Sequence, residues 1–368
     1  MNVGIVIDTT LDSDAGVQQY FKGLASYLIK RGHNVTFLVP QSINRGEFKG
    51  RIISLSKTFT PFISSTKVPI SLPTSKKKIV SVLQEKQFDM IHIGAPFSPF
   101  LGAKVVENAQ CPIVLTYLVI TSNKINRLGL KILKLILKKA YKKIDAHIAL
   151  TEGAYVEARA AIPGKYRIIP GGVNMMKYSP DQKPLKRYVD DLKTILFLGR
   201  LEKRKGVRYL LKAFAIVQKR IPNTRLIIAG DGPEREELET LAKRLKIKNV
   251  VFEGYIDEKL KPRYYASADI CVFPSIFGES FGVVLVEALA SGKVVLAYDN
   301  EGYQCVLKNL PKLLVRRYSV GELSRKIISF LSNVQKKKEY ELKCYNESKK
   351  FHWDVVGEQI LTVYKSLL

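Results

Sequence analysis

The chain has 368 residues, of which 46% are hydrophobic and 25% are charged, so two globular domains are expected and a largely disordered chain is excluded. Its 60 Lys and Arg residues against 33 Asp and Glu residues give a formal net charge of +27. Such a charge attracts nucleic acid, anionic lipid or phosphorylated small molecules, and it does not distinguish between them.

The sequence carries no pattern for a membrane span, a signal peptide or a metal centre. No run approaches the ~18 apolar residues of a transmembrane helix, and Met1–Asp8 reads as a β-strand. The cysteines are far apart and none of the histidines has metal-ligand spacing. We expect free thiols in a reducing cytoplasm, no metal and no cofactor.

Short β-branched runs alternate with helical patterns along the first half, which is typical of parallel βαβ units. The expected elements are, in chain order, strand Val3–Asp8, helix Val17–Lys30 and strands Val35–Val39, Met90–Ile93, Ile113–Leu115, Ala146–Leu150 and Arg167–Ile169. The segment Tyr178–Lys193, rich in Pro, Lys and Asp, reads as a linker.

The same alternation restarts after this segment. The expected elements are strand Thr194–Leu198, helix Gly206–Arg220, strand Arg225–Ala229, helix Glu234–Leu245, strands Val250–Phe252 and Ile270–Phe273, helix Val283–Ala290 and strand Val294–Ala297. We therefore expect an α/β protein of two Rossmann-like domains with parallel sheets: an N-terminal domain at 1–183, completed by a C-terminal helix at 353–368, and a second domain at 190–352. Because ligands bind at the carboxyl ends of parallel strands, the expected site is the cleft between the domains.

The string from Phe277 to Gly292 carries two carboxylates eight residues apart, Glu279 in a loop and Glu287 in the following helix. A glycine between them, Gly282, allows close approach of the backbone to a ligand. Free N–H groups at the helix start suit a phosphate or a sugar hydroxyl. The alternative is an ordinary helix start with two solvated carboxylates.

A second string, Phe197–Gly206, places Arg200 and Lys205 between a strand and a helix. A planar guanidinium and a compact ammonium at a helix N-terminus form a clamp for a diphosphate. The alternative is a solvated basic turn.

A third string, Asp14-Ala15-Gly16-Val17-Gln18, follows the first strand. Gly16 is placed as in a glycine loop for an acceptor, and a plain helix cap by Asp14 is an equally economical interpretation. The nearby Asp12-Ser13-Asp14 is too weak a signal for a metal site.

These strings together resemble glycosyltransferase family 4, the retaining nucleotide-sugar transferases with the GT-B fold, and within it the phosphatidylinositol mannosyltransferases. The resemblance spans nearly the whole chain and includes further strings in family order: Ala95–Pro99, Ile169–Asn174, Ala229–Pro233 and His352–Val356.

The resemblance implies roles for particular residues. Arg200 and Lys205 would hold the donor diphosphate, Glu279 the transferred sugar and Glu287 the ribose, with Glu279, Arg200 and Lys205 as the catalytic set. The donor site would also include Ile256, Glu258, Lys261, Ser280, Phe281, Gly282 and Val283, and the acceptor site Gly16 and Gln18. The donor would be a nucleoside-diphosphate sugar, with GDP-mannose favoured, and transfer would retain anomeric configuration without a metal.

The acceptor half departs from the family pattern. The family usually has a His in the stretch that here reads Leu115–Thr121, and His-Glu-Pro where this chain has Gly94-Ala95-Pro96. This departure leaves two alternatives to a lipid acceptor: a soluble or polysaccharide acceptor, and a non-catalytic relative that binds nucleotide sugars.

The first half is short of acidic residues, because Met1–Lys183 holds 26 basic and 11 acidic residues and the remainder holds 34 and 22. One helical stripe of cations runs through an apolar stretch: Lys124, Arg127, Lys131, Lys134, Lys138 and Lys142. With the cluster Lys76, Lys77 and Lys78, this pattern favours contact with an anionic membrane, and a buried helix with one solvated edge is the alternative.

We therefore expect a peripheral protein at the cytoplasmic face of the plasma membrane, with a lipid or lipid-linked acceptor. A nucleic-acid-binding protein is the competing class, but the sequence contains no recognised nucleic-acid module and no aromatic residues interleaved with the basic stripe.

Overall fold

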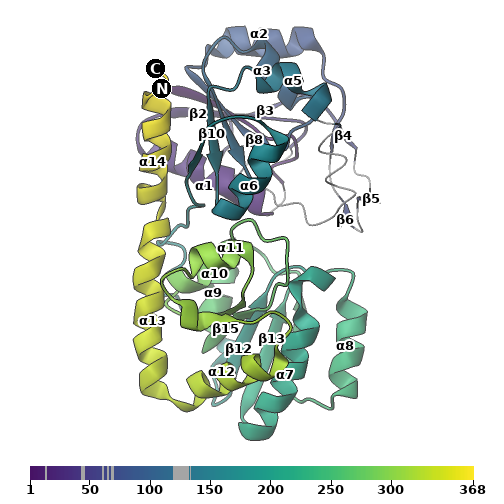
Figure 1. The fold of residues 1–368 in the computed structure, drawn as a ribbon, viewed down its shortest axis with the longest axis vertical. Coiled ribbons are helices and arrows are strands. Elements are labelled where there is room, and N and C mark those ends of the chain that lie inside the picture. The colour runs from purple at the N-terminus through teal and green to yellow at the C-terminus, as the bar shows by residue number, and fades with distance from the viewer. Residues whose placement is uncertain are drawn as a thin grey trace. The chain divides into compact units, whose positions relative to one another are not determined.

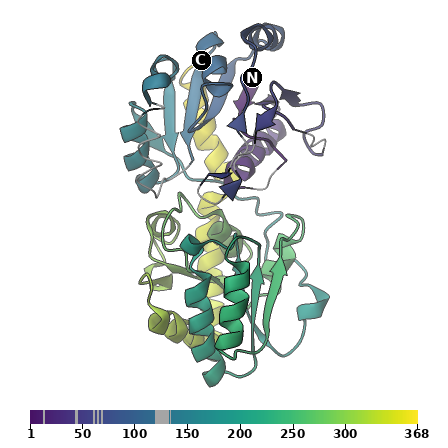
Figure 2. The ribbon, with the colours of Figure 1, turned by 90° about the vertical axis from the view of Figure 1, so that its right-hand side faces the viewer.

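The computed structural model describes residues 1–12, 15–42, 46–59, 62–63, 66–67, 70–118, 132 and 134–368. Its contacts divide the chain into two compact units, Met1–Gly172 with Trp353–Leu368, and Val173–His352. Each unit is built on a parallel β-sheet flanked by helices (Figures 1 and 2).

In the first unit the described residues form a seven-stranded parallel sheet in the order β11-β10-β9-β8-β1-β2-β3. These strands are β1 (Asn2–Val6), β2 (Asn34–Val39), β3 (Ile52–Ser54), β8 (Met90–Ala95), β9 (Ile113–Tyr117), β10 (Ala146–Ala149) and β11 (Tyr166–Ile168). Two short antiparallel pairs lie outside it, β4 (Thr58–Phe59) with β7 (Ile70–Ser71) and β5 (Phe62–Ile63) with β6 (Thr66–Lys67). The helices are α1 (Gly16–Lys30), α2 (Lys76–Lys86), α3 (Gly102–Asn108), α5 (Lys138–Tyr141), α6 (Glu152–Ala161) and α14 (Trp353–Lys365).

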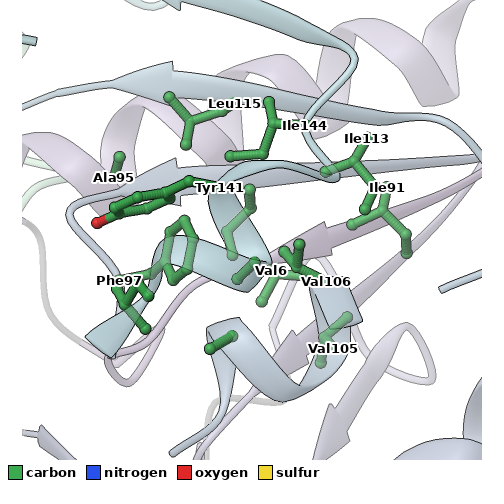
Figure 3. Packing of buried hydrophobic residues seen from close by; sticks show 14 of the residues in the cluster. Val6, Ile91, Ala95, Phe97, Val105, Val106, Ile113, Leu115, Tyr141 and Ile144 are labelled. Atoms are coloured by element: carbon green, nitrogen blue, oxygen red, sulfur yellow. The ribbon is translucent and has the colours of Figure 1, made fainter. Parts of the chain in front are cut away.

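The central strands of this sheet are buried and mostly apolar because helices cover both faces, and their buried polar residues include His92 and Thr116, which bond to each other at 2.6 Å. Val6, Ile91 and Leu115, from three neighbouring strands, have no exposed surface. Figure 3 shows them packed with Phe97 and Tyr141, whose ring centroids are 5.3 Å apart in an edge-on contact. This core supports the loops at the carboxyl ends of β1 and β8.

The final helix, α14, packs against α1 in the first unit (Figure 1). The hydroxyl of Tyr27 donates to Glu358 at 2.9 Å. Two glycines make the close approach possible: a Cβ at Gly23 would lie 2.3 Å from the Trp353 indole, and one at Gly357 would lie 2.3 Å from the Tyr27 ring. The C-terminal helix is therefore part of the first unit's core.

In the second unit the described strands form a six-stranded parallel sheet in the order β14-β13-β12-β15-β16-β17. They are β12 (Lys193–Leu198), β13 (Thr224–Ala229), β14 (Val250–Gly254), β15 (Ile270–Phe273), β16 (Val294–Tyr298) and β17 (Leu314–Val315). The helices are α7 (Val207–Arg220), α8 (Arg235–Arg244), α9 (Lys261–Ala266), α10 (Val283–Ala290), α11 (Glu301–Val306), α12 (Val320–Ser332) and α13 (Val334–Ser348). The expected strands and helices in both units, outside the basic stripe, match to within three residues at each end, the largest difference being at the end of α14.

The interpretation of Tyr178–Lys193 as a linker is wrong. Tyr188 is buried, the guanidinium of Arg225 lies 4.7 Å from its ring centroid, and Arg225 pairs with Asp190 at 2.7 Å. The structure also places 173–183 in the second unit, since the Val173 amide donates to the Phe351 carbonyl at 2.7 Å. Aromatic and ionic contacts hold a segment whose low aliphatic content suggested a solvated connection.

None of the helices in the described part of the chain combines the length and the hydrophobicity needed to cross a bilayer.

We expect Gly23→Ala to lower the free energy of unfolding by about 1–3 kcal/mol, because its methyl group would collide with Trp353. Urea unfolding followed by fluorescence measures this change, since Trp353 is the only tryptophan. Gly16→Ala is the control in the same helix, where a Cβ meets no atom within 4 Å. Equal effects of the two substitutions would contradict the packing explanation.

Candidate functional site

The candidate donor site is built from the loops that follow β12 and β15 in the second unit. These loops touch through their backbones, since the Ile276 amide donates to the Arg204 carbonyl at 2.7 Å. Gly206 has a φ of +68°, and a Cβ there would lie 2.1 Å from the Pro274 carbonyl oxygen. Glycine at this position allows the two loops to meet at the carboxyl edge of the sheet.

The centre of the site is a buried ion cluster. The Glu279 carboxylate, 9% exposed, receives the Lys205 ammonium at 2.6 Å and the Arg204 guanidinium at 3.1 Å, both on Oε1. Of these three residues, the sequence analysis named Glu279 and Lys205. The structure thus joins one residue from each of the two principal motifs.

Burial alone would raise the pKa of Glu279, but the charges of Lys205 and Arg204 and a hydrogen bond from Ser275 outweigh it and hold the pKa below its ordinary value. Ser275 in turn accepts a hydrogen bond from the Tyr303 hydroxyl at 2.9 Å. Glu279 is therefore an ionised, oriented carboxylate that can accept hydroxyl hydrogen bonds.

The other predicted clamp residue, Arg200, lies in the same loop but pairs elsewhere. Its Nε contacts Glu202 at 2.9 Å, and Arg204 contacts the other oxygen of Glu202 at 2.8 Å. Arg204 therefore bridges Glu202 and Glu279. The sequence analysis missed it, although the basic triplet at 203–205 was the available signal.

The loop after β15 leads into α10 through Gly282, whose φ is +98°. A Cβ there would lie 2.6 Å from the Tyr303 ring, so only glycine fits. No acidic side chain lies in the first turn of α10 and no side chain caps it. The half-buried Ser280 and Val283 flank this helix start.

Phe281, which was expected in the donor site, is 2% exposed and packs edge-on against Phe351 at 5.5 Å. Its ring therefore belongs to the core of the second unit, and a place for its backbone in the donor site stays a prediction.

A second cluster of charges surrounds Glu287, which is 2% exposed in α10. The Tyr265 hydroxyl donates to its Oε2 at 2.8 Å, and the Lys261 ammonium lies 3.8 Å from its Oε1. Lys261 also pairs with Glu258 at 2.7 Å, while the Tyr178 hydroxyl donates to Glu258 at 2.8 Å.

The pKa values of Glu287 and Glu258 are shifted in opposite directions. Burial and the neighbouring charge of Glu258 raise the pKa of Glu287, with Lys261 opposing them. Burial would raise the pKa of Glu258 as well, but Lys261 and Lys177 lower it below its ordinary value. The half-buried Ile256 precedes Glu258 in the same loop. Sequence reasoning missed Lys177, Tyr178 and Tyr265, which carry no motif.

The expected acceptor residues belong to the first unit. Gln18 is 4% exposed, and its Nε2 donates to Thr9 Oγ1 at 2.6 Å and to the Thr10 carbonyl at 3.0 Å. Its Oε1 is buried and accepts no hydrogen bond from the described residues. Gly16, the exposed first residue of α1, has open space around it.

The expected membrane-contact residues differ in their exposure, and some of them lie outside the described residues. Lys76, Lys77 and Lys78 are exposed in the first turn of α2, and Lys138 is exposed at the start of α5. Lys134 is half-buried and donates to the Ala160 carbonyl at 3.1 Å. The remaining three, Lys124, Arg127 and Lys131, lie outside the described residues, as does Asp14.

Two family models match the chain in succession. Residues 15–177 match "Glycosyltransferase Family 4" and residues 180–350 match "Glycosyl transferases group 1". The matches fall on the two halves that carry the two sheets.

The chain is similar to named proteins over most of its length. It is 31% identical over 373 residues to a phosphatidyl-myo-inositol mannosyltransferase of Mycolicibacterium smegmatis, covering 100% of this chain and 94% of that protein. It is 27% identical over 320 residues to an alpha-monoglucosyldiacylglycerol synthase of Streptococcus pneumoniae, covering 82% and 71% of the two chains. A sucrose-phosphate synthase structure from Thermosynechococcus elongatus superposes with a TM-score of 0.78 at 21% identity, covering 100% and 98% of the two chains.

We expect Glu279→Gln to lower the free energy of unfolding by about 3 kcal/mol at neutral pH, because it removes the carboxylate that pairs with Lys205 and leaves Arg204 with Glu202 alone. The folded-state pKa of Glu279 lies below the ordinary value of 4.5, so its stabilisation is present above 4.5 and is lost as the pH falls through the folded-state pKa. The two proteins should therefore converge in stability on acidification.

Urea unfolding followed by circular dichroism over a pH series measures this difference. Glu236→Gln, at an exposed position in α8, is the matched control. A gap between wild type and Glu279→Gln that stays constant with pH would refute the ion-pair explanation.

Proposed function

Because this chain belongs to glycosyltransferase family 4 and has the GT-B fold, we propose that it transfers a hexose, with mannose favoured, from a nucleoside-diphosphate sugar to a lipid acceptor. GDP-mannose is the favoured donor, and a membrane lipid or lipid-linked acceptor of the phosphatidylinositol type is the favoured acceptor. The name of the mycolicibacterial relative supports mannose as the transferred sugar and a phosphatidylinositol-type acceptor, and the choice of GDP comes from the family resemblance.

The observation that carries this proposal is the ion cluster on Glu279. Arg204 and Lys205 meet at one carboxylate oxygen, and Arg200 lies at the start of the same loop. A nucleoside diphosphate would bind Arg200 and Lys205, with Arg204 positioning Glu202 and Glu279. The amide groups at the start of α10 would add to this positive field.

These groups suit the electrostatic demand of the reaction. The bond from the anomeric carbon to the diphosphate breaks with negative charge accumulating on the leaving oxygen, and preorganised cations stabilise that charge in the transition state. Three cations supply what a divalent metal would otherwise provide, so we propose a metal-independent reaction. Glu279 would hold the hydroxyls of the transferred sugar.

The stereochemical proposal is retention. The acceptor hydroxyl would attack from the face of the departing diphosphate, whose oxygen would take the hydroxyl proton as the new glycosidic bond forms. On the acceptor side, we propose that the acceptor binds beside the exposed Gly16, with Gln18 holding the Thr9 and Thr10 loop. The closure of a cleft between the two units stays a prediction.

Two features of the first unit support membrane association: cations at the helix end that disfavours them, and exposed aliphatic side chains close to a further cation. Lys76, Lys77 and Lys78 occupy the first turn of α2, where the helix dipole disfavours cations and no acidic residue compensates. Near Lys138, the large apolar side chains of Ile132, Leu135 and Ile136 are 53%, 76% and 59% exposed. Cations beside exposed aliphatic groups suit the inner face of an anionic membrane, where we propose that the protein binds peripherally.

We expect the double variant Arg200→Ala, Lys205→Ala to reduce donor hydrolysis and transfer by about 1000-fold, because the leaving diphosphate loses its cations. Release of nucleotide from a panel of GDP-, UDP- and ADP-sugars, with EDTA present, measures this loss. Lys203→Ala is the control, since Lys203 is an exposed cation of the same loop. Undiminished turnover in the double variant would overturn the proposed donor site.

We expect replacement of Lys76, Lys77 and Lys78 by Ala to weaken binding to anionic vesicles by about 100-fold, at about 1 kcal/mol per cation. Co-sedimentation with phosphatidylglycerol–phosphatidylcholine vesicles measures this binding, and pure phosphatidylcholine vesicles show its charge dependence. A triple Ala variant of the exposed Lys212, Lys219 and Lys243 removes equal charge from the second unit. Equal losses in both triple variants would argue against a specific membrane face.

A further inference from the structure

The segment after the Ile169–Asn174 string contains two residues, Lys177 and Tyr178, whose side chains contact the Glu258 carboxylate. Asn174 builds the turn: its Oδ1 accepts from the Met176 and Lys177 amides at 3.0 and 3.1 Å, and its carbonyl accepts from the Tyr178 amide at 2.9 Å. This turn presents Lys177 and Tyr178 on the side of Glu258.

Both side chains bind the same oxygen of Glu258. The Lys177 ammonium contacts Oε1 at 2.7 Å and the Tyr178 hydroxyl donates to it at 2.8 Å, while Lys261 contacts Oε2 at 2.7 Å. Glu258 is thus fixed from three directions. A carboxylate has about four acceptor positions, and the buried Oε2, although it is paired with Lys261, accepts no hydrogen bond from the described residues, so part of its acceptor capacity is unused.

Tyr178 also connects this carboxylate to Glu287. Its ring meets Tyr265 edge-on at 5.8 Å, and the Tyr265 hydroxyl donates to Glu287 at 2.8 Å. Tyr178 contributes to the electrostatics of Glu287 by its own hydroxyl as well. One phenol therefore lies between the two carboxylates and holds the spacing between them.

We propose that Tyr178 is a positioning residue for nucleoside recognition, whose hydroxyl fixes Glu258 beside Glu287 so that base and ribose are bound together. This inference rests on the proposed function and on the expected place of Glu287 at the ribose, and it takes Glu258, an expected donor-site residue, as the group that meets the nucleobase. The residue that it adds, Tyr178, lies outside the ion cluster on Glu279 and is not itself proposed to contact the sugar.

The energetic reason is preorganisation. Without the hydroxyl, Oε1 of Glu258 keeps only Lys177, whose side chain is 32% exposed and has more rotamer freedom than a buried tyrosine. The ligand would then have to order the carboxylate as it binds, which weakens its affinity.

The Tyr178 hydroxyl also affects the pKa of Glu287. Burial and Glu258 raise the pKa of Glu287, whereas Lys261 and the hydroxyls of Tyr265 and Tyr178 oppose the rise. Removing the Tyr178 hydroxyl raises that pKa further. An ionised Glu287 is the better acceptor for ribose hydroxyls, so the loss of affinity in the variant should grow as the pH falls.

The test is calorimetric titration of wild type and Tyr178→Phe with GDP, UDP and ADP, and with inorganic diphosphate, which lacks the nucleoside. We expect about tenfold weaker binding of whichever nucleoside diphosphate wild type binds, and unchanged binding of inorganic diphosphate. The pH at which nucleotide binding is half lost should rise in the variant.

Two further variants separate positioning from folding. Tyr188→Phe removes another hydroxyl that binds a carboxylate, that of Glu253, elsewhere in the same unit, and should leave nucleotide affinity unchanged. Lys177→Met removes a partly exposed ion pair from the same oxygen of Glu258 and should weaken nucleotide binding by about threefold. Melting curves of all variants report on the fold.

The outcomes are distinct. If wild type binds inorganic diphosphate but no nucleoside diphosphate, the proposed function fails, and this inference fails with it. If wild type binds a nucleoside diphosphate and Tyr178→Phe binds it equally, only the inference is overturned. A parallel loss for nucleotide and inorganic diphosphate would also overturn it, because that loss would indicate a general structural role.

Discussion

The buried charge of Glu279 constrains the whole candidate donor site. A carboxylate taken out of water is costly unless it is paired and hydrogen-bonded, and here Lys205, Arg204 and Ser275 provide those partners. The pairs join two loops that follow non-adjacent stretches of sequence, and Gly206 lets the loop backbones touch. The positions of Lys205 and Arg204 therefore match the need of this one buried group for counter-charges.

The second unit separates two kinds of chemistry. Cations predominate around Glu279, where an anionic diphosphate is proposed to bind. Around Glu287 and Glu258, where hydroxyl and N–H groups of a nucleoside are proposed to bind, two phenols and two lysines surround the two carboxylates. A nucleoside diphosphate likewise carries its negative charge at the diphosphate end and its hydroxyl and N–H groups at the nucleoside end. The arrangement therefore favours one direction of binding before any sugar is considered.

The cations behind the net charge of +27 fall into two groups in the described structure, those paired with acidic residues and those without such a pair. Many cations of the second unit are neutralised locally, as Arg225 is by Asp190 and Arg208 by Glu234. By contrast, Lys76, Lys77 and Lys78 form no ion pair with a described acidic residue and lie at the unfavourable end of a helix. Lys78 donates to the Ser54 and Leu55 carbonyls at 3.0 and 3.4 Å, and the proposed membrane contact would give the charges of this cluster an external partner.

The sequence by itself determined the two parallel sheets, the family and most of the cation and carboxylate positions, because β-branched runs, glycine loops and short motifs are local signals. It did not determine Arg204 as a bridge, Phe281 as a core residue, or the packed state of Tyr178–Lys193. Those depend on partners distant in sequence: Glu279 for Arg204, Phe351 for Phe281, and Glu258 for Tyr178. Only the tertiary structure decides which of many equivalent charged or aromatic side chains are buried together, since burial strengthens an ion pair and makes an unpaired charge costly.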